Sequence, residues 1–131
     1  MEPDRLAAVC RAHGVRLLLQ FGSTVSGRVH AASDVDLAVL LERRPPSLDA
    51  HLDLIGDLQA LVSDRDVDVA LLNGADPLLL KKITEQCRLL YGSPRALHEL
   101  KIYAFKRYQD HRRFLAMEAA YVTERIRALA R

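Results

Sequence analysis

Three aspartates are the residues of this sequence best suited to chemistry. Asp34 and Asp36 are two positions apart in the segment DVDLAVLL, and Asp68 lies in the similar segment DVDVALLN. Both segments begin by alternating acidic with apolar residues, which is the periodicity of a β-strand. Because residues i and i+2 of a strand point to the same face, we expect the carboxylates of Asp34 and Asp36 to lie together. Asp68 would join them from a second strand.

Carboxylates grouped in this way favour divalent-metal chemistry. Three of them on one face repel each other strongly unless a cation lies among them. Mg²⁺ usually takes one or two carboxylates and leaves its other positions to water and phosphate. Two metal ions that share carboxylates stabilise the attacking and leaving oxygens of phosphoryl or nucleotidyl transfer. The alternative is that the acids are solvated residues at strand ends, and neither segment alone decides between these interpretations.

A Gly-Ser pair upstream favours the metal interpretation. Gly22 and Ser23 follow the apolar run VRLLLQF, and ten residues separate Ser23 from Asp34. A turn of this kind between a strand and a helix presents backbone N–H groups and a hydroxyl to a phosphate, and Gly22 allows close approach of the backbone. Gly27 would end the short helical turn and return the chain to the strand that bears the acids. Together these features predict a magnesium-dependent pocket that binds a phosphate group.

The elements that must position these residues alternate along the chain. Apolar periodicity, Gly and Pro breaks and N-cap residues indicate where these elements begin and end. They predict helices over residues 4–13 and 76–86, from 93 to near 130, and from 47, the last with Leu52, Ile55, Leu58 and Val62 on one face. They predict strands over residues 15–21, 34–41, 66–72 and, at an edge, 88–91. This order predicts an α/β fold, with a small mixed sheet flanked by helices and a long C-terminal helical tail. We expect residues 1–92 to form the core and residues 93–131 to extend the same domain.

The last helix poses a question of its own. Straight, it would measure about 55 Å, whereas a chain of 131 residues has a radius of gyration of about 14 Å. The helix must therefore bend back, with residues 109–113 as the expected bend or solvated stretch, or project. Beyond these residues an apolar seam follows the 4-3-4-3 spacing of a heptad pattern, and it consists of Leu115, Ala119, Val122, Ile126 and Leu129. The seam packs on the chain's own sheet or on a partner helix, and the pattern does not decide which.

Composition bounds the remaining possibilities. Half of the 131 residues are hydrophobic and 27% are charged, which suits one compact domain. Net charge is +2, but residues 34–76 hold ten acids against three arginines, and residues 95–131 hold nine bases against four acids. We find no membrane-length apolar run and no signal-peptide pattern. Cys10 and Cys87 fit neither a zinc site nor a disulfide framework, so we expect reduced core thiols in a cytoplasmic protein.

Several other residues could suggest binding sites. The five histidines have no metal-ligand spacing, although His30 could touch a nucleotide. Arg43 and Arg44 are typical of a solvated loop. The aromatics at positions 103, 105 and 108 could stack on RNA, but they have helical spacing and we expect them to pack in the core.

The stretch FGSTVSGRVHAASDVDLAVL, followed by DVDVALLN, resembles the minimal nucleotidyltransferase (MNT) family of the DNA polymerase β-like superfamily. The family pattern is Gly-Ser, ten residues, Asp-x-Asp and a third Asp on a neighbouring strand. It is matched here by Gly22, Ser23, Asp34, Asp36 and Asp68. The sequence departs from the family at Ser26, where many members have Arg, with Arg28 following Gly27 instead. Asp66 is an additional acid beside the third position.

The resemblance implies an activity and a partner. MNT proteins are antitoxins of HEPN-domain ribonuclease toxins, and the implied reaction is AMPylation, the transfer of AMP from ATP to a tyrosine of the HEPN partner. Asp34 and Asp36 would hold two Mg²⁺ ions, Asp68 would complete the shell of the second, and Gly22, Ser23 and Gly27 would contact the nucleotide. The protein would work in a hetero-oligomer, without membrane or direct nucleic-acid binding. Two alternatives are a small-molecule nucleotidyltransferase, for instance of aminoglycosides, and an antitoxin that acts by binding alone.

Overall fold

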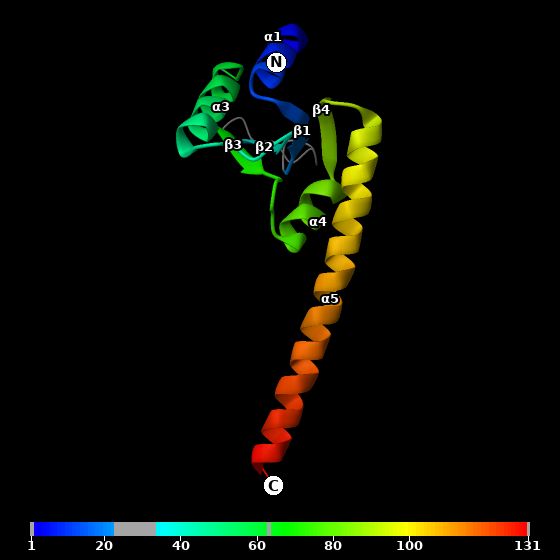
Figure 1. Ribbon diagram of the computed structural model, residues 1–131. Coiled ribbons are helices and arrows are strands. Elements are labelled where there is room, and N and C mark those ends of the chain that lie inside the picture. The colour runs from blue at the N-terminus through cyan, green and yellow to red at the C-terminus, as the bar shows by residue number, and fades with distance from the viewer. Residues whose placement is uncertain (1, 23–33, 63, 131) are drawn as a thin grey trace.

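The computed structural model describes residues 2–22, 34–62 and 64–130. Within them the chain forms, in order, α1 (Pro3–Ala12), β1 (Val15–Phe21), β2 (Val35–Leu41), α3 (Leu48–Ala60), β3 (Val67–Leu71), α4 (Pro77–Glu85), β4 (Cys87–Tyr91) and α5 (Pro94–Ala130). The predicted α/β fold with a small mixed sheet, flanking helices and a long C-terminal helix is confirmed (Figure 1).

The four strands form one sheet in the order β3-β2-β1-β4. β1 is antiparallel to both β2 and β4, whereas β2 and β3 are parallel. A parallel pair needs a crossover connection, and α3 supplies it. The expected edge strand is therefore confirmed as β4, which pairs with β1.

Helices cover both faces of the sheet (Figure 1). On β2, Leu37 and Val39 point toward α1 and α3 and join a buried cluster that includes Leu54 and Leu58. Ala38, between them, points the other way into a second cluster formed with α4 and α5. This alternation is the period of two of a strand whose two faces are both covered.

The buried face of α3 differs from the predicted one. Ser47 caps the helix by accepting a hydrogen bond from the backbone N–H of Ala50 at 3.1 Å. The buried residues are Leu54 and Leu58, while Leu52 is exposed and Val62 lies beyond the end of the helix. Several leucines in this segment can form an i, i+4 stripe, so their spacing alone does not select the stripe that faces the sheet.

The C-terminal helix α5 is continuous over 37 residues and projects from the rest of the molecule (Figure 1). Of the two alternatives for this helix, projection is confirmed, and a helix that bends back at residues 109–113 is wrong, because the helix continues through this stretch. Of the two alternatives for the seam, packing on the chain's own sheet is also wrong: Leu115, Val122, Ile126 and Leu129 are 47% to 82% exposed. The sheet ends before the helix reaches these residues.

The aromatic residues of α5 and the two cysteines differ in how far they match the expected burial. Tyr103 and Phe105 are 52% and 64% exposed, so their predicted core packing is wrong, while Tyr108 is half-buried. Both thiols are free, with Cys10 buried and Cys87 half-buried. In the described part of the chain, no helix has the length and apolarity that a membrane crossing requires.

Candidate active site

The register of the parallel pair brings two of the candidate acids together. Asp36 on β2 is paired directly with Asp68 on β3. The pairing begins one residue earlier, where the Val35 backbone N–H donates a hydrogen bond of 2.8 Å to the carbonyl oxygen of Asp66. Residues paired in a parallel sheet point to the same face, so the two carboxylates lie side by side. Asp34 is two residues before Asp36 and precedes the strand.

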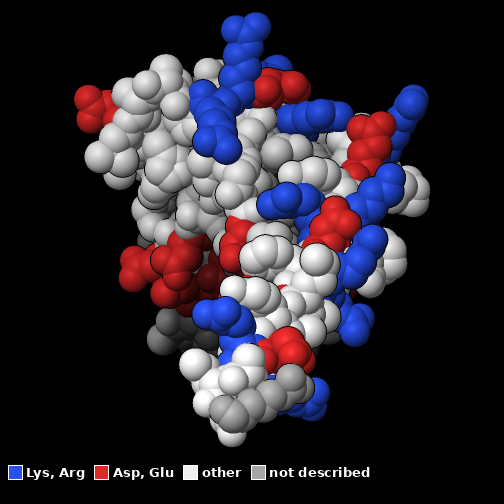
Figure 2. Space-filling view, turned by 60° about the horizontal axis from the view of Figure 1, so that its bottom comes forward, with Lys and Arg blue, Asp and Glu red and all other residues white. Residues whose placement is uncertain are grey.

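The acids share their sheet face with α4 and α5. Asp36 alternates with Leu37, whose side chain is in the cluster beneath α1 and α3, and it lies on the same face as Ala38. The apolar core of this second face thus ends at Ala38 and gives way to carboxylates at the start of the strand. Figure 2 shows several Asp and Glu side chains gathered in one patch on this end of the molecule.

Burial and neighbouring negative charge both act on the acidity of Asp36. Its pKa is raised, first because its carboxylate is partly removed from water and then because the charges of Asp68 and Asp34 lie near it. Lys82 acts in the opposite direction and lowers the same pKa. Asp34 and Asp68 are exposed. Hard oxygen donors that repel each other at an accessible position are a donor set that fits a divalent cation such as Mg²⁺.

The described residues contain no group of three His, Cys, Asp or Glu side chains arranged as a metal centre. A Mg²⁺ site does not need three, because this ion is usually held by one or two carboxylates while water and substrate phosphate complete its octahedron. The paired carboxylates of Asp36 and Asp68 meet that requirement, and Asp34 adds negative charge beside them.

Gly22 lies directly against the Asp36 carboxylate. Its φ is +80°, a left-handed conformation that favours glycine. A Cβ at this position would overlap Oδ2 of Asp36 and lie 3.1 Å from its Cγ. The absence of a side chain at position 22 is therefore what lets the backbone after β1 meet the acid. Ser23 and Gly27, together with Arg28 and His30, lie outside the described residues, so their expected contacts remain predictions.

Lys82 is a candidate that sequence reasoning missed. On α4 the residues Leu80, Ile83 and Thr84 face the core. Lys81 forms an ion pair with Glu85 and lies 4.9 Å from the ring centroid of Tyr108 on α5. Lys82 is exposed, forms no ion pair with the described residues and acts electrostatically on Asp36. The packing of α4 on the acid-bearing face decides which of the two lysines acts on Asp36. No local sequence pattern indicates this packing.

With this geometry in view, the family follows from a comparison of sequences. The sequence model of the family described as "Polymerase beta, Nucleotidyltransferase" matches residues 5–96. The chain belongs to this nucleotidyltransferase family. The match spans α1 to the start of α5 and so includes the acids of β2 and β3. No curated protein matches the chain significantly in sequence.

Solved structures share the fold of this nucleotidyltransferase. A chain of a toxin–antitoxin crystal structure with AMP-PNP is 23% identical, with a TM-score of 0.73 over 96% of this chain and 99% of that one. A chain of the tri-AMPylated Shewanella oneidensis HEPN toxin in complex with MNT antitoxin is 21% identical, with a TM-score of 0.66 over 95% of each chain. Spectinomycin adenyltransferase AAD(9) from Enterococcus faecialis, with ATP and spectinomycin, is 15% identical, with a TM-score of 0.56 over 74% of this chain and 57% of that one.

Proposed function

We propose that the chain is the antitoxin of a HEPN/MNT pair and transfers AMP from ATP to a tyrosine hydroxyl of its HEPN ribonuclease toxin. The observation that carries the proposal is the in-register pair Asp36 and Asp68 on an accessible sheet face, against the backbone of Gly22. The fold shared with chains of toxin–antitoxin structures, one with AMP-PNP and one with an AMPylated toxin, supports the choice of nucleotide and partner.

Each residue of the site has a part in the proposed reaction. Asp34, Asp36 and Asp68 would hold two Mg²⁺ ions, whose positive charge stabilises phosphate oxygens and acidifies a nearby hydroxyl. The tyrosine hydroxyl loses its proton either through acidification by the bound ion alone or to Asp68, which would accept it at a carboxylate oxygen. The tyrosine oxygen forms a bond to the α-phosphorus of ATP, the bond to the bridging oxygen breaks, and pyrophosphate leaves. No covalent intermediate with the chain is needed.

Cationic and backbone groups complete the proposed site. Lys82 binds the triphosphate, because it forms no ion pair with the described residues and already acts on Asp36 from α4. The backbone at Gly22 and the predicted contacts of Ser23 and Gly27 orient the phosphates. As parts of the same proposal, residues 93–131 extend the domain formed by residues 1–92, and the complex is a cytoplasmic hetero-oligomer.

The test is transfer of α-phosphate label from ATP in the presence of Mg²⁺ and the co-expressed HEPN partner. We expect label on the partner with the wild-type chain, and a loss of more than about a hundredfold in Asp36→Asn. Asp66→Asn is the matched control, since Asp66 lies two residues before Asp68 and contributes its backbone carbonyl oxygen to the sheet. Its rate should stay within about twofold of wild type, as for most surface substitutions.

The same experiment separates the alternatives. Spectinomycin adenyltransferase has the same fold, so label on an aminocyclitol or aminoglycoside instead of the partner would favour small-molecule transfer. A tight complex without label on either acceptor would favour an antitoxin that acts by binding alone. Full transfer by Asp36→Asn would reject the assigned site.

A further inference from the structure

The projecting half of α5 has no packing partner within the described chain. Its buried residues are Ala96, Leu100 and Ala104, all in the first turns, and every residue from Arg112 to Ala130 is exposed. Most of the stability of a helix in a protein comes from packing of one face against other elements, and this segment has no such packing. Large apolar side chains gathered on such a helix mark a surface that another protein covers.

Five of the apolar side chains form one straight stripe, while Phe114, Met117 and Tyr121 lie on other sides of the helix. Leu115, Ala119, Val122, Ile126 and Leu129, here called the distal stripe, prolong the series Leu97, Leu100, Ala104, Tyr108 and His111. The first three of that series pack toward the sheet and α4. The mean spacing along the whole series is about 3.6 residues, which is the period of a straight α-helix. The distal stripe therefore faces the same side as the part of α5 that packs on the core.

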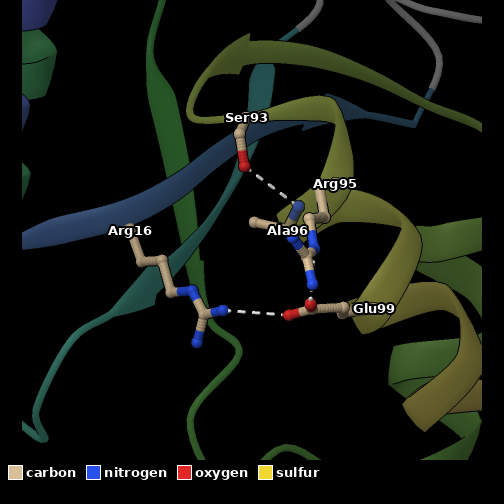
Figure 3. Close-up of polar contacts among 5 residues, drawn as sticks. All are labelled: Arg16, Ser93, Arg95, Ala96 and Glu99. Carbon is tan, nitrogen blue, oxygen red and sulfur yellow. Dashed lines mark hydrogen bonds and ion pairs between the residues drawn. The ribbon is translucent and has the colours of Figure 1, made fainter.

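The start of α5 fixes the direction in which the distal stripe extends. Gly92 and Ser93 form the turn after β4, and Ser93 Oγ accepts a hydrogen bond from the Ala96 backbone N–H at 3.0 Å. Glu99 forms ion pairs of 3.1 Å with Arg16 on β1 and of 3.4 Å with Arg95 (Figure 3). From this anchor α5 runs back along β4 and continues past the opposite end of the sheet (Figure 1).

That opposite end is the one that bears the acids. Cys87, the first residue of β4, is paired with Phe21, and Phe21 is paired in turn with Asp36. The projecting half of α5 therefore passes the acid end of the sheet, with the distal stripe turned toward the space in front of that end. A protein bound along the distal stripe would therefore lie beside the acid end of the sheet.

Charge helps to choose the occupant. α5 carries eight Lys and Arg residues against four Asp and Glu residues, and its projecting part from Arg112 to Ala130 carries four against two. A second copy of the chain would bring the same positive excess to the contact, whereas an acidic partner would complement it. We propose that the distal stripe is the docking surface for the protein that accepts AMP, a partner with an apolar helical ridge and acidic flanks whose hydroxyl then faces Asp36 and Asp68. The acceptor role rests on the proposed function.

The test compares two faces of the same exposed helix. The double variant Val122→Glu/Ile126→Glu places charge on the distal stripe. Met117→Glu places a single glutamate on the opposite side of the helix, at a side chain that is 71% exposed. Affinity for the HEPN partner is measured by titration, transfer by label on the partner, and affinity for Mg²⁺-ATP by equilibrium binding. Because glutamate could alter the helix, a Val122→Ala/Ile126→Ala variant of high helix propensity is measured beside it.

We expect the double glutamate variant to bind the partner at least about a hundredfold more weakly, since a charge in an apolar contact cannot be paired. Val122→Ala/Ile126→Ala should weaken binding by about tenfold or more, and Met117→Glu should change it by less than about twofold. Affinity for Mg²⁺-ATP should be unchanged in all three. At saturating partner, the rate of transfer should recover.

Other outcomes separate the two proposals. Unchanged partner binding in both stripe variants would overturn the docking surface, whether or not wild type transfers AMP. A wild-type chain that is a dimer, with stripe variants that become monomers and still bind the partner, would assign the stripe to a second copy and also overturn it. Partner binding that depends on the stripe, without any transfer by wild type, would confirm the docking surface and reject the proposed function.

Discussion

The two faces of the sheet use the same strand differently. On β2, Val35, Leu37 and Val39 all enter the core beneath α1 and α3. On the other face, Ala38 is buried under α4 and α5, but Asp36 two residues earlier is a partly exposed carboxylate. The first face is apolar along its full length and holds the fold together. The second face is shared between a core and a charged site. This indicates that the packing of the first face holds the acids of the second in place.

Removing packing from the first face gives the largest effect on stability. Leu58 is completely buried in the cluster beneath α3. Leu58→Ala should lower the free energy of unfolding by about 2–5 kcal/mol, through lost burial and the cavity left behind. Urea unfolding measures this loss, and label transfer per folded molecule should stay near the wild-type value. A folded Leu58→Ala protein without transfer would show that the two faces do not act separately.

Displacing an acid on the second face should affect chemistry more than stability. Gly22→Ala places a Cβ where the Asp36 carboxylate oxygen lies, at a φ of +80°. We expect transfer to fall by about a hundredfold, the usual cost of misplacing a reacting group by about 1 Å. Gly56→Ala on α3 is the control, since a Cβ there meets no atom within 4 Å. Equal rates in the two variants would contradict the contact between Gly22 and the acid.

Neighbouring lysines on α4 provide a finer test of the second face. Lys82→Met should raise the KM for ATP by about tenfold, the loss of one charged contact to phosphate. Lys81→Met should change it by less than about twofold, because that side chain is engaged with Glu85 and Tyr108. Steady-state kinetics at saturating partner measures both. The reverse order would assign the phosphate contact to the side of α4 that faces α5.

The smallest effect concerns a thiol on the first face. Burial raises the pKa of Cys10 to about 11 from its ordinary value of 9.0. The unfolded thiol therefore ionises first, and the contribution of Cys10 to stability should be lost as pH rises from 9 through 11. Cys10→Ala removes this contribution, so the difference in unfolding free energy between wild type and variant should shrink over that range. A difference that stays constant would mean that the thiol ionises equally in both states.

Local signals allowed much of the fold to be predicted. The strand over residues 15–21 and the helix after Asp76 follow from an apolar run and an N-cap. The buried stripe of α3 did not follow, because neighbouring leucines offer equivalent stripes and only the sheet selects one. The helix over residues 93–130 was predicted, but whether it bends at residues 109–113 or projects was left open. Polar residues such as Gln and Arg are good helix formers, so their presence signals solvent and not a break.

The candidate site was predictable to the extent that it depends on period and spacing. Alternation placed Asp34 and Asp36 on one face, and the repeat of the pattern at Asp68 suggested a neighbour. The pairing of Asp36 with Asp68 requires β2 and β3 to run parallel, and they do so because α3 forms a crossover between them. Lys82 and the exposure of Tyr103 depend on how helices pack, and no spacing along the chain encodes that.

The turn at Gly92 fixes the angle at which α5 leaves the sheet. Its φ is +113°, and a Cβ there would lie 2.5 Å from the carbonyl oxygen of Arg16, so a larger residue would have to push the first turn of α5 away from β1. Over a helix about 55 Å long, a tilt of about 10° moves the far tip by about 10 Å. The residue at position 92 therefore sets the direction of α5. A substitution there would leave a partner able to bind the distal stripe but would shift it relative to the acids.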